Sequence, residues 1–270
     1  METDSTRSAP DATRFTTAAR AILDGIDAQA ETVDRVAELC ADAITAGGLV
    51  HLFGTGHSRI PVEEMFPRYG SYPGFNPMVE LSMTFHTQVV GSNGQRQAMF
   101  IERTPGLADA ILANYELRPT DVMIVFSASG LSTVPIEMAL GAKERGLAMV
   151  AVTSVAQSHA GEPTHAAGRL LDVADIVLDL CTPPADALVE IEGLETPVAP
   201  GSTLAAVALV NEIKARTARR LVERHAMPPV ITSAAVVGRE ESARLFDAAY
   251  AEHARRYARS LRGAEADRRA

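Results

Sequence analysis

Short apolar runs alternate with longer segments of helical periodicity along this chain, and this alternation limits the possible folds more than any other feature. The runs are apolar or β-branched, which is typical of strands that are buried on both faces of a sheet. They comprise residues 49–53, 83–90, 122–126, 147–153 and 174–180. We therefore expect an α/β fold, a three-layer α/β/α sandwich with a doubly wound parallel sheet of about five strands.

Between these runs, apolar residues recur every three or four positions, as they do on one face of a helix. From residue 13 to 46 this pattern predicts one long helix, which Gly47 and Gly48 end. Further helices are expected over residues 106–115, 133–146 and 202–225. Ser202 is the expected N-cap of the last helix.

The chain is expected to have three parts. Residues 1–13 lack an apolar core and read as a disordered leader rather than a secretory signal. Residues 14–238 are expected to form a single domain that includes the N-terminal helix. Residues 239–270 are Arg-rich and read as a helical tail that packs on the outside of the domain or on a partner subunit.

The composition restricts the class of protein. A net charge of −9 disfavours a nucleic-acid partner, because phosphate backbones are bound by basic patches. No apolar run approaches the roughly 20 residues that cross a membrane. Cys40 and Cys181 lie in apolar runs without metal-ligand spacing, and no pair of histidines has zinc-ligand spacing. We expect a cytoplasmic protein with no membrane partner, no metal and no other cofactor.

The segment SASGLST, which follows the run at 122–126, crowds hydroxyl groups around one glycine where a strand ends and a helix begins. Its polar and glycine positions are Ser127, Ser129, Gly130, Ser132 and Thr133. At such a junction, unpaired N–H groups and the helix dipole favour an anion. A single hydroxyl would suffice for an N-cap, so the segment predicts a phosphate-binding loop. It lacks the lysine of a nucleotide P-loop, so nucleotide hydrolysis is not expected.

The segment GTGHS, residues 54–58, repeats this arrangement after the first strand. It is not a dinucleotide-binding loop, because Arg59 stands where the third glycine of G-x-G-x-x-G would be. We expect Gly56 and Ser58 to bind the ligand and His57 to reach the substrate or its phosphate. Two such junctions in one parallel sheet open on the same edge, where α/β proteins bind ligands.

Together the two loops resemble those of the sugar isomerase (SIS) domain, the phosphosugar-binding fold of phosphoheptose isomerase and N-acetylmuramic acid 6-phosphate etherase. The resemblance covers residues 20–225, and its most specific part is the S-x-S-G-x-[ST] pattern at 127–132. It implies that the loop serines bind a sugar phosphate and that Ser58 faces the sugar. In SIS proteins a hydroxyl-rich helix start, here at Ser202, helps to enclose the ligand. A homodimer or homotetramer with sites at or near an interface is also implied.

An aldose–ketose isomerase needs a base that moves a proton between neighbouring carbons. Phosphoheptose isomerase carries a glutamate pair in the helix after its first loop, and the corresponding helix here contains Glu63 and Glu64. Glu64 is the expected base, because apolar neighbours such as Val62 would raise its pKa. The pair follows Ser58 about one helical turn sooner than in that enzyme. Glu80 is a reserve candidate.

The sequence therefore predicts a phosphosugar-binding protein. The predicted activity is the interconversion of the aldose and ketose forms of a sugar phosphate. Three alternatives stay open. An etherase or lyase would use a similar glutamate to eliminate a substituent from the sugar. A sensor would bind the sugar phosphate without turning it over. A third kind of protein would bind an unphosphorylated or sulfonated sugar in the same loops.

Overall fold

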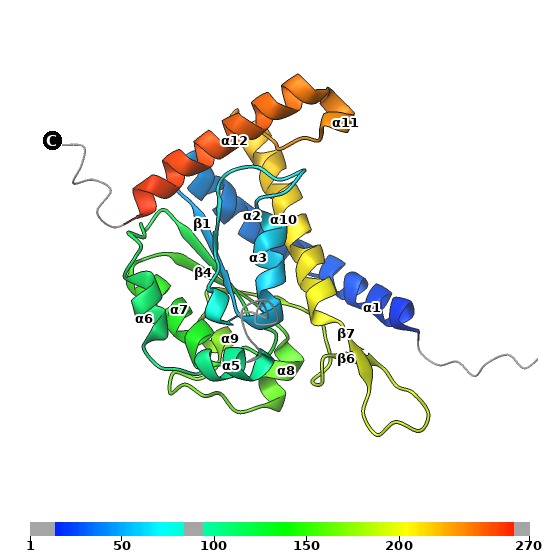
Figure 1. Cartoon of the computed structure of the whole chain (residues 1–270). Helices are drawn as coiled ribbons and strands as arrows, with labels where there is room; N and C mark the ends of the chain where they lie inside the picture. The colour runs from blue at the N-terminus through cyan, green and yellow to red at the C-terminus, as the bar shows by residue number, and fades with distance from the viewer. Residues whose placement is uncertain (1–13, 84–93, 262–270) are drawn as a thin grey trace, which may run out of the picture.

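The computed structural model describes residues 14–83 and 94–261 of the chain, arranged as helices around a central sheet (Figure 1). Three expectations lie wholly or partly outside the described residues: the leader at 1–13, the strand at 83–90 and the end of the tail. No helix of the described part is both long and apolar enough to span a membrane.

Five parallel strands form the central sheet in the order β2–β1–β3–β4–β5. They are β1 (Val50–Gly54), β2 (Phe75–Met78), β3 (Val122–Phe126), β4 (Ala148–Thr153) and β5 (Ile176–Asp179). The expected doubly wound α/β sandwich is confirmed. The strand order reverses between β1 and β3, and ligands of such sheets bind beyond the carboxyl ends of the strands at the reversal.

The edge strand β2 lies earlier in the chain than the sequence predicted. Met83, the first residue of the strand expected at 83–90, is in the 3₁₀-helix η2 (Leu81–Met83), and the residues after it are outside the described ranges. The strand beside β1 is instead Phe75–Met78. Pro77 concealed it, because proline interrupts a strand pattern but is tolerated in an edge strand.

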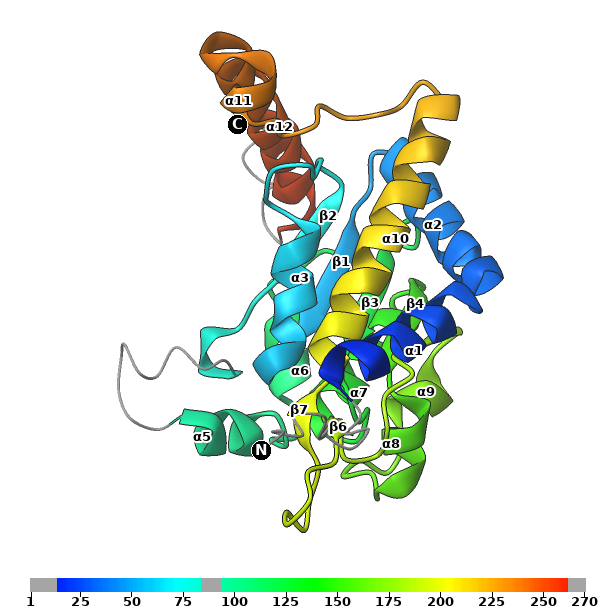
Figure 2. The same cartoon turned by 90° about the vertical axis from the view of Figure 1, so that its right-hand side faces the viewer.

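Helices cover both faces of the sheet, so that the sheet lies between two helical layers in Figure 1, and Figure 2 looks onto one of these layers. One face packs against α1 (Phe15–Asp27), α2 (Ala30–Thr45), α3 (Ile60–Met65) and α10 (Ser202–Glu223). The other packs against α6 (Leu107–Leu112), α7 (Thr133–Glu144) and α9 (Leu170–Val173). The remaining elements are η1 (Gly56–Arg59), α5 (Gly94–Ile101), α8 (Val155–Ala160), α11 (Ala234–Val237), α12 (Arg239–Ser260) and the antiparallel hairpin of β6 (Ala187–Val189) and β7 (Val198–Pro200).

Successive residues of each strand enter two separate cores, because side chains alternate between the faces of a sheet. In β3, Ile124 packs in the core beneath α2 and α10, whereas Met123 and Val125 pack in the core beneath α7. All three side chains are fully buried. Burying each contributes about 1.5–3 kcal/mol to the free energy of unfolding, which explains why the strands are continuous apolar runs.

The long N-terminal helix expected from the sequence is two helices, α1 and α2, with Gln29 at the corner between them. The Gln29 side-chain amide donates to the Asp179 carbonyl oxygen at 2.9 Å and accepts from the Asp179 N–H at 2.8 Å. These bonds attach the corner to the end of β5. Helical periodicity does not report such a contact, because it depends on a residue far along the chain.

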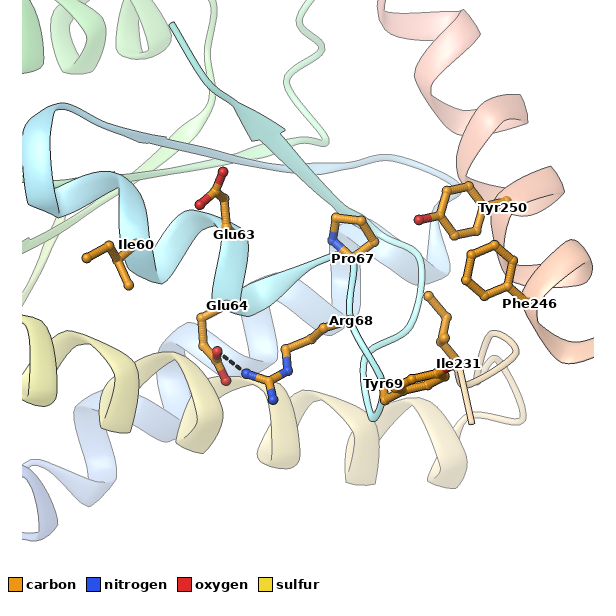
Figure 3. Close-up of a pocket in the computed structure, with 9 residues that line it drawn as sticks. All are labelled: Ile60, Glu63, Glu64, Pro67, Arg68, Tyr69, Ile231, Phe246 and Tyr250. Carbon is orange, nitrogen blue, oxygen red and sulfur yellow. Dashed lines mark hydrogen bonds and ion pairs between the residues drawn. The ribbon is translucent and has the colours of Figure 1, made fainter. Parts of the chain in front are cut away.

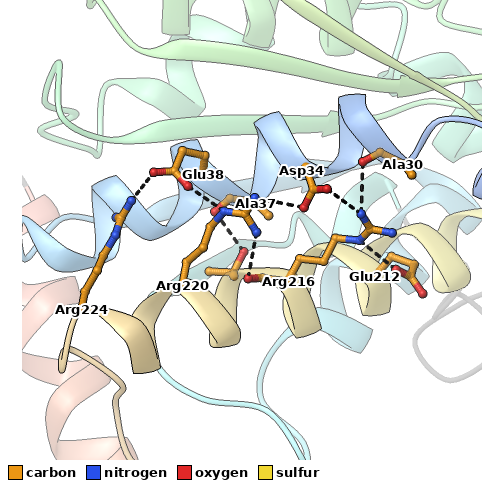
Figure 4. Close-up of polar contacts among 9 residues, drawn as sticks. Ala30, Asp34, Ala37, Glu38, Glu212, Arg216, Arg220 and Arg224 are labelled. Atoms are coloured by element: carbon orange, nitrogen blue, oxygen red, sulfur yellow. Dashed lines mark hydrogen bonds and ion pairs between the residues drawn. The ribbon is translucent and has the colours of Figure 1, made fainter.

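Helix α10 packs against α2 along a row of ion pairs (Figure 4). The row consists of Asp34, Glu38 and Asp42 on α2 and Arg216, Arg220 and Arg224 on α10. Arg220 contacts both Asp34, at 3.0 Å, and Glu38, at 2.6 Å. Members of each set recur every four residues, so the row aligns the two helices turn by turn. Each exposed pair is worth about 0–1 kcal/mol.

The amino edge of the sheet contains a buried polar network centred on His51. Its Nε2 atom lies 3.4 Å from Asp121 Oδ2, and its Nδ1 atom lies 3.0 Å from the Asn76 amide nitrogen. Because a carboxylate accepts and an amide NH₂ donates, these contacts assign the ring proton to Nε2. Asp121 also accepts the backbone N–H groups of Leu49 and Arg118, both at 3.0 Å.

The tail helix α12 packs on the outside of the domain near the same edge. The His253 ring lies 4.8 Å from the Phe66 ring, and Arg256 donates to the carbonyl oxygens of Ile44 and Gly48. The Glu116 N–H donates to the Ser260 carbonyl oxygen at 2.7 Å. The helix is therefore anchored at several points along its length.

Candidate functional site

A cavity of about 320 Å³ opens at the carboxyl edge of the sheet, above the loops that follow β1 and β3. The register aligns Gly54 with Phe126, so both loops leave the sheet at the same level. The polar side chains of the cavity include Thr55, Ser58, Glu102, Ser127, Ser129 and Ser132. The two loops singled out in the sequence therefore meet in one cavity, at the reversal of strand order where a ligand is expected.

The loop after β3 is held tightly against β4. Gly130 has φ of 64°, and a Cβ atom there would lie 2.9 Å from the Thr153 hydroxyl oxygen. Its N–H donates to the Ser127 hydroxyl at 3.2 Å. Gly130 therefore shapes the loop and does not itself line the cavity, whereas Ser127, Ser129 and Ser132 do.

Ser132 occupies the N-cap position of α7, but its hydroxyl makes no cap bond there. It donates instead to Glu102 Oε1 at 2.9 Å. Thr133, expected to bind ligand, shares a hydrogen bond of 2.8 Å with the Thr164 hydroxyl and does not line the cavity. Ser132 therefore faces the cavity, whereas Thr133 faces a neighbouring loop.

The amino end of α7 carries unused hydrogen-bond donors. The N–H groups of Ser129, Leu131 and Ser132 donate to no other described residue. The dipole of this 12-residue helix adds partial positive charge at the same place. Neither Lys nor Arg is among the described residues that line the cavity. An anion bound here would be held by backbone N–H groups and serine hydroxyls.

The loop after β1 folds back over its own strand as the short helix η1. A Cβ atom on Gly54 would lie 2.2 Å from the Ser58 carbonyl oxygen, and Gly56 has φ of 55°, so both positions require glycine. The loop places Ser58 and an exposed His57 at the wall of the cavity. Thr55, at the start of the loop, donates to Glu102 Oε2 at 2.6 Å.

Glu102 is the carboxylate that joins the two loops, and it is not among the residues predicted from the sequence. It follows α5 directly, and its two oxygens accept from Thr55 and Ser132 on opposite sides. Its carbonyl oxygen also accepts the Val134 N–H at 2.9 Å, which ties the backbone to α7. No local motif surrounds Glu102 in the sequence, so only the tertiary fold brings it into the cavity.

The structure does not bring Glu63 and Glu64 to this cavity. They line a separate cavity of about 580 Å³ between α3 and α12, together with Tyr69, Phe246 and Tyr250 (Figure 3). This second cavity has an aromatic wall, since the rings of Phe246 and Tyr250 stack at 4.5 Å.

Each of these glutamates pairs with an arginine one helical turn away. Glu63 accepts from Arg59 at 2.8 Å. Glu64 pairs with Arg68 and accepts from the Asn211 amide of α10 at 3.1 Å, and Figure 3 shows its carboxylate turned toward that helix.

The sequence predicted a raised pKa for Glu64, and the structure corrects this prediction. Burial alone would raise the pKa of this carboxyl. The hydrogen bonds from Asn211 and Arg68, and the charges of Arg68 and Lys214, outweigh burial and hold the pKa below its ordinary value. A carboxylate with a lowered pKa is a weaker base. Glu80, the reserve candidate, has a pKa raised by burial but is not among the residues that line the cavity.

The amino end of α10 also faces the cavity, but a side chain fills it. Asp186 Oδ1 accepts the N–H groups of Gly201 at 3.2 Å and Ser202 at 2.8 Å, and its Oδ2 accepts the Ser202 hydroxyl at 2.6 Å. The sequence predicted that Ser202 is the N-cap of this helix. In the structure Ser202 is instead the first residue of the helix, and Gly201 is at the N-cap position. Asp186 takes the capping role, and with it the place of an external anion.

The described residues contain no group of three or more His, Cys, Asp and Glu side chains arranged to hold a metal ion. Glu102 and Asp186 are the carboxylates among the described residues that line the cavity, and hydroxyls or backbone N–H groups of the protein already satisfy both. The cavity therefore combines hydrogen-bond donors at the amino end of α7 with the carboxylates of Glu102 and Asp186.

Comparison with known proteins places this geometry in context. The SIS domain family matches residues 14–154, a range that contains both loops and Glu102. A UPF0309 protein of Geobacillus kaustophilus (strain HTA426) is 34% identical over 223 residues, which cover 82% of this chain and 86% of that protein. A UPF0309 protein of Streptomyces coelicolor is 32% identical over 216 residues, which cover 80% and 84%. A solved phosphoheptose isomerase from Francisella tularensis aligns with 76% of this chain and 94% of its own, at 14% identity and a TM-score of 0.49.

Proposed function

The chain belongs to the SIS domain family, and we propose that it binds a sugar phosphate at the carboxyl edge of its sheet and interconverts the aldose and ketose forms. The observation that carries the proposal is the amino end of α7, where the hydroxyls of Ser127, Ser129 and Ser132 surround one space beside N–H groups that donate to no other described residue. Asp186 already fills the amino end of α10, so the phosphate is assigned to α7.

The sugar then extends from α7 toward the loop after β1, where Ser58 and His57 line the cavity. In the proposed reaction, Glu102 removes the proton from the carbon beside the carbonyl group and returns it to the former carbonyl carbon. The hydroxyl proton moves from one oxygen to the other in the same interval, so no atom is gained or lost.

We assign the base to Glu102 in place of Glu64 because Glu102 alone of the two lines the cavity that contains the phosphate-binding loops. Thr55 and Ser132 orient its two oxygens before the substrate arrives. The proposal also includes, from the family, a homodimer or homotetramer that works in the cytoplasm. The same carboxylate could start an elimination, so an etherase or lyase is the second candidate.

A panel of sugar phosphates and the matching free sugars, tested by thermal denaturation, checks the binding step. A ligand at 100 times its dissociation constant adds about 2.7 kcal/mol to the free energy of unfolding. We expect stabilisation by a sugar phosphate and not by its free sugar. Stabilisation by none of the phosphates would contradict the proposal.

Incubation of the stabilising ligand with the protein, followed by NMR, then separates the candidates. Appearance of the isomeric sugar phosphate indicates an isomerase, and loss of a substituent indicates a lyase. An unchanged ligand indicates a sensor and would contradict the proposed reaction while leaving the binding site intact.

A further inference from the structure

The hairpin of β6 and β7 ends in an acidic and apolar turn, which we call the hairpin tip (residues 190–195). It contains three glutamates and two exposed apolar side chains: Glu190, Ile191, Glu192, Leu194 and Glu195. Ile191 and Leu194 are about half exposed, at 46% and 54%. The base of the hairpin is anchored, because Leu188 packs on the core and Asp186 binds the start of α10. The tip itself projects from the body (Figures 1 and 2).

A basic and apolar groove runs along the outer face of α5 and the turn after it, and we call it the α5 groove. It has a volume of about 670 Å³ and is lined by Arg96, Met99, Phe100, Arg103, Thr104 and Pro105. Phe100 is 75% exposed and its neighbour Met99 is 39% exposed, so the two side chains form a contiguous apolar patch in the groove.

The two surfaces are complementary in both charge and polarity. The hairpin tip offers three carboxylates around two aliphatic side chains, and the α5 groove offers two guanidinium groups around Met99 and Phe100. Within the described part of the chain, neither Arg96 nor Arg103 forms an ion pair, and none of the three glutamates does. Both elements lie at the same end of the molecule, yet the tip points away from α5 of its own chain (Figures 1 and 2).

We propose that the hairpin tip of one copy docks into the α5 groove of a second copy, and that the second copy returns the same contact. A twofold pair satisfies both surfaces at once, because such an interface uses the same two patches on each subunit.

The proposed contact lies beside the cavity of the functional site. Gln95 and Met99 of α5 line one side of that cavity, and Pro200 of the hairpin lines another. Docking would therefore cover the opening of each cavity with the partner's hairpin. The inference names the surface for the self-association included in the proposed function. Its test measures assembly alone, so it can fail while sugar-phosphate binding stands, and the reverse also holds.

Sedimentation velocity on charge-reversed variants of the full chain tests the contact. One variant carries Arg96→Glu and Arg103→Glu, and the other carries Glu190→Lys, Glu192→Lys and Glu195→Lys. We expect the wild type to assemble and each variant alone to dissociate, with a dissociation constant raised by about 100-fold or more, because like charges then face each other. An equal mixture of the two variants should reassemble, since a mixed pair has complementary charges at both contacts.

A control reversal at an exposed arginine on α12, Arg255→Glu, should leave the assembly unchanged. Circular dichroism establishes that each variant is folded. A monomeric wild type overturns the proposal, as does an assembly that survives both reversals. Failure of the mixture to reassemble also overturns it, because the two surfaces would then not be partners.

Discussion

The two edges of the central sheet both contain buried polar side chains, but they arrange them differently. At the amino edge, Asp121 accepts two backbone N–H groups and faces the ring of His51. At the carboxyl edge, Glu102 accepts two side-chain hydroxyls, from Thr55 and Ser132, and faces a cavity. Backbone donors cannot turn away from their acceptor without local unfolding, whereas a hydroxyl can rotate toward a ligand. We infer that a carboxylate that accepts backbone N–H groups, such as Asp121, stabilises the fold. A carboxylate that accepts side-chain hydroxyls beside a cavity, such as Glu102, is instead placed to act on a ligand.

Removing the charge of Glu102 is expected to have the largest effect on the carboxyl edge. Glu102→Gln keeps the shape of the side chain, so we expect the ligand to bind within a few-fold of wild type. The turnover number should fall about 10²–10⁴-fold, because a positioned base contributes that much. Glu63→Gln, in the other cavity, is the matched control and should retain full turnover. Equal turnover in the Glu102 variant and wild type would show that the base lies elsewhere.

At the amino edge the expected loss is in stability. Asp121→Ala leaves the N–H groups of Leu49 and Arg118 and the ring of His51 without their acceptor, which should cost about 3 kcal/mol of the free energy of unfolding. Chemical denaturation measures this loss. Glu144→Ala, an exposed position on α7, should stay within about 0.5 kcal/mol of wild type. If the Asp121 variant instead bound ligand more weakly while remaining as stable as wild type, the two edges would not be functionally distinct.

Ser129→Ala at the carboxyl edge should weaken binding of the phosphosugar by about 1.5–3 kcal/mol, the worth of a hydrogen bond to a charged group. Calorimetric titration gives the affinity, and denaturation should detect almost no change in stability, since the hydroxyl is only half buried. The loss should disappear for the corresponding free sugar. An equal loss of affinity for both ligands would show that the phosphate does not bind at the amino end of α7.

The smallest effect is a pH dependence at the amino edge. Burial alone would raise the pKa of Asp121, but the hydrogen bonds from His51 and from the Leu49 and Arg118 backbone outweigh it and lower the pKa. Asp121 therefore stabilises the fold above its unfolded pKa of about 3.9, and this contribution is lost as the pH falls through the lower, folded pKa.

Denaturation curves of wild type and Asp121→Asn should differ most near neutral pH and converge below about pH 4. Comparing the two proteins removes the contribution of the other carboxylates with lowered pKa values, such as Asp34 and Asp175. A difference in stability that did not change with pH would contradict the role given to the charge of Asp121.

The sequence predicted the doubly wound fold and both loops because their signals are local. A continuous apolar run and a cluster of hydroxyls around Gly130 each fall within a few residues of the chain. Ser132 and Ser202 show the limit of such signals, because both stand at helix starts. Only the structure reveals that Ser132 turns to Glu102 while Ser202 turns to Asp186.

The carboxylates could not be assigned from the sequence, since tertiary contacts determine their environment. Glu64 belongs to the Glu63–Glu64 pair that is visible in the sequence. Its carboxylate, however, accepts a hydrogen bond from Asn211, which is 147 residues further along the chain. Glu102 belongs to no motif, and its partners Thr55 and Ser132 lie 47 and 30 residues away. The edge strand that contains Pro77 was missed for a related reason. Proline is tolerated in an edge strand but not in a central one, and the position of a strand in the sheet is a tertiary property.

The ion-pair row between α2 and α10 has a consequence for how the protein is made. Asp34 and Arg216 are 182 residues apart, so a ribosome must synthesise most of the chain before α2 can meet the helix that covers it. Until then, the apolar face of the sheet beneath α10 stays open to solvent, and contacts so distant in sequence form slowly. A chain interrupted before α10 would expose that face permanently, so premature termination anywhere upstream should yield material that aggregates rather than a smaller working domain.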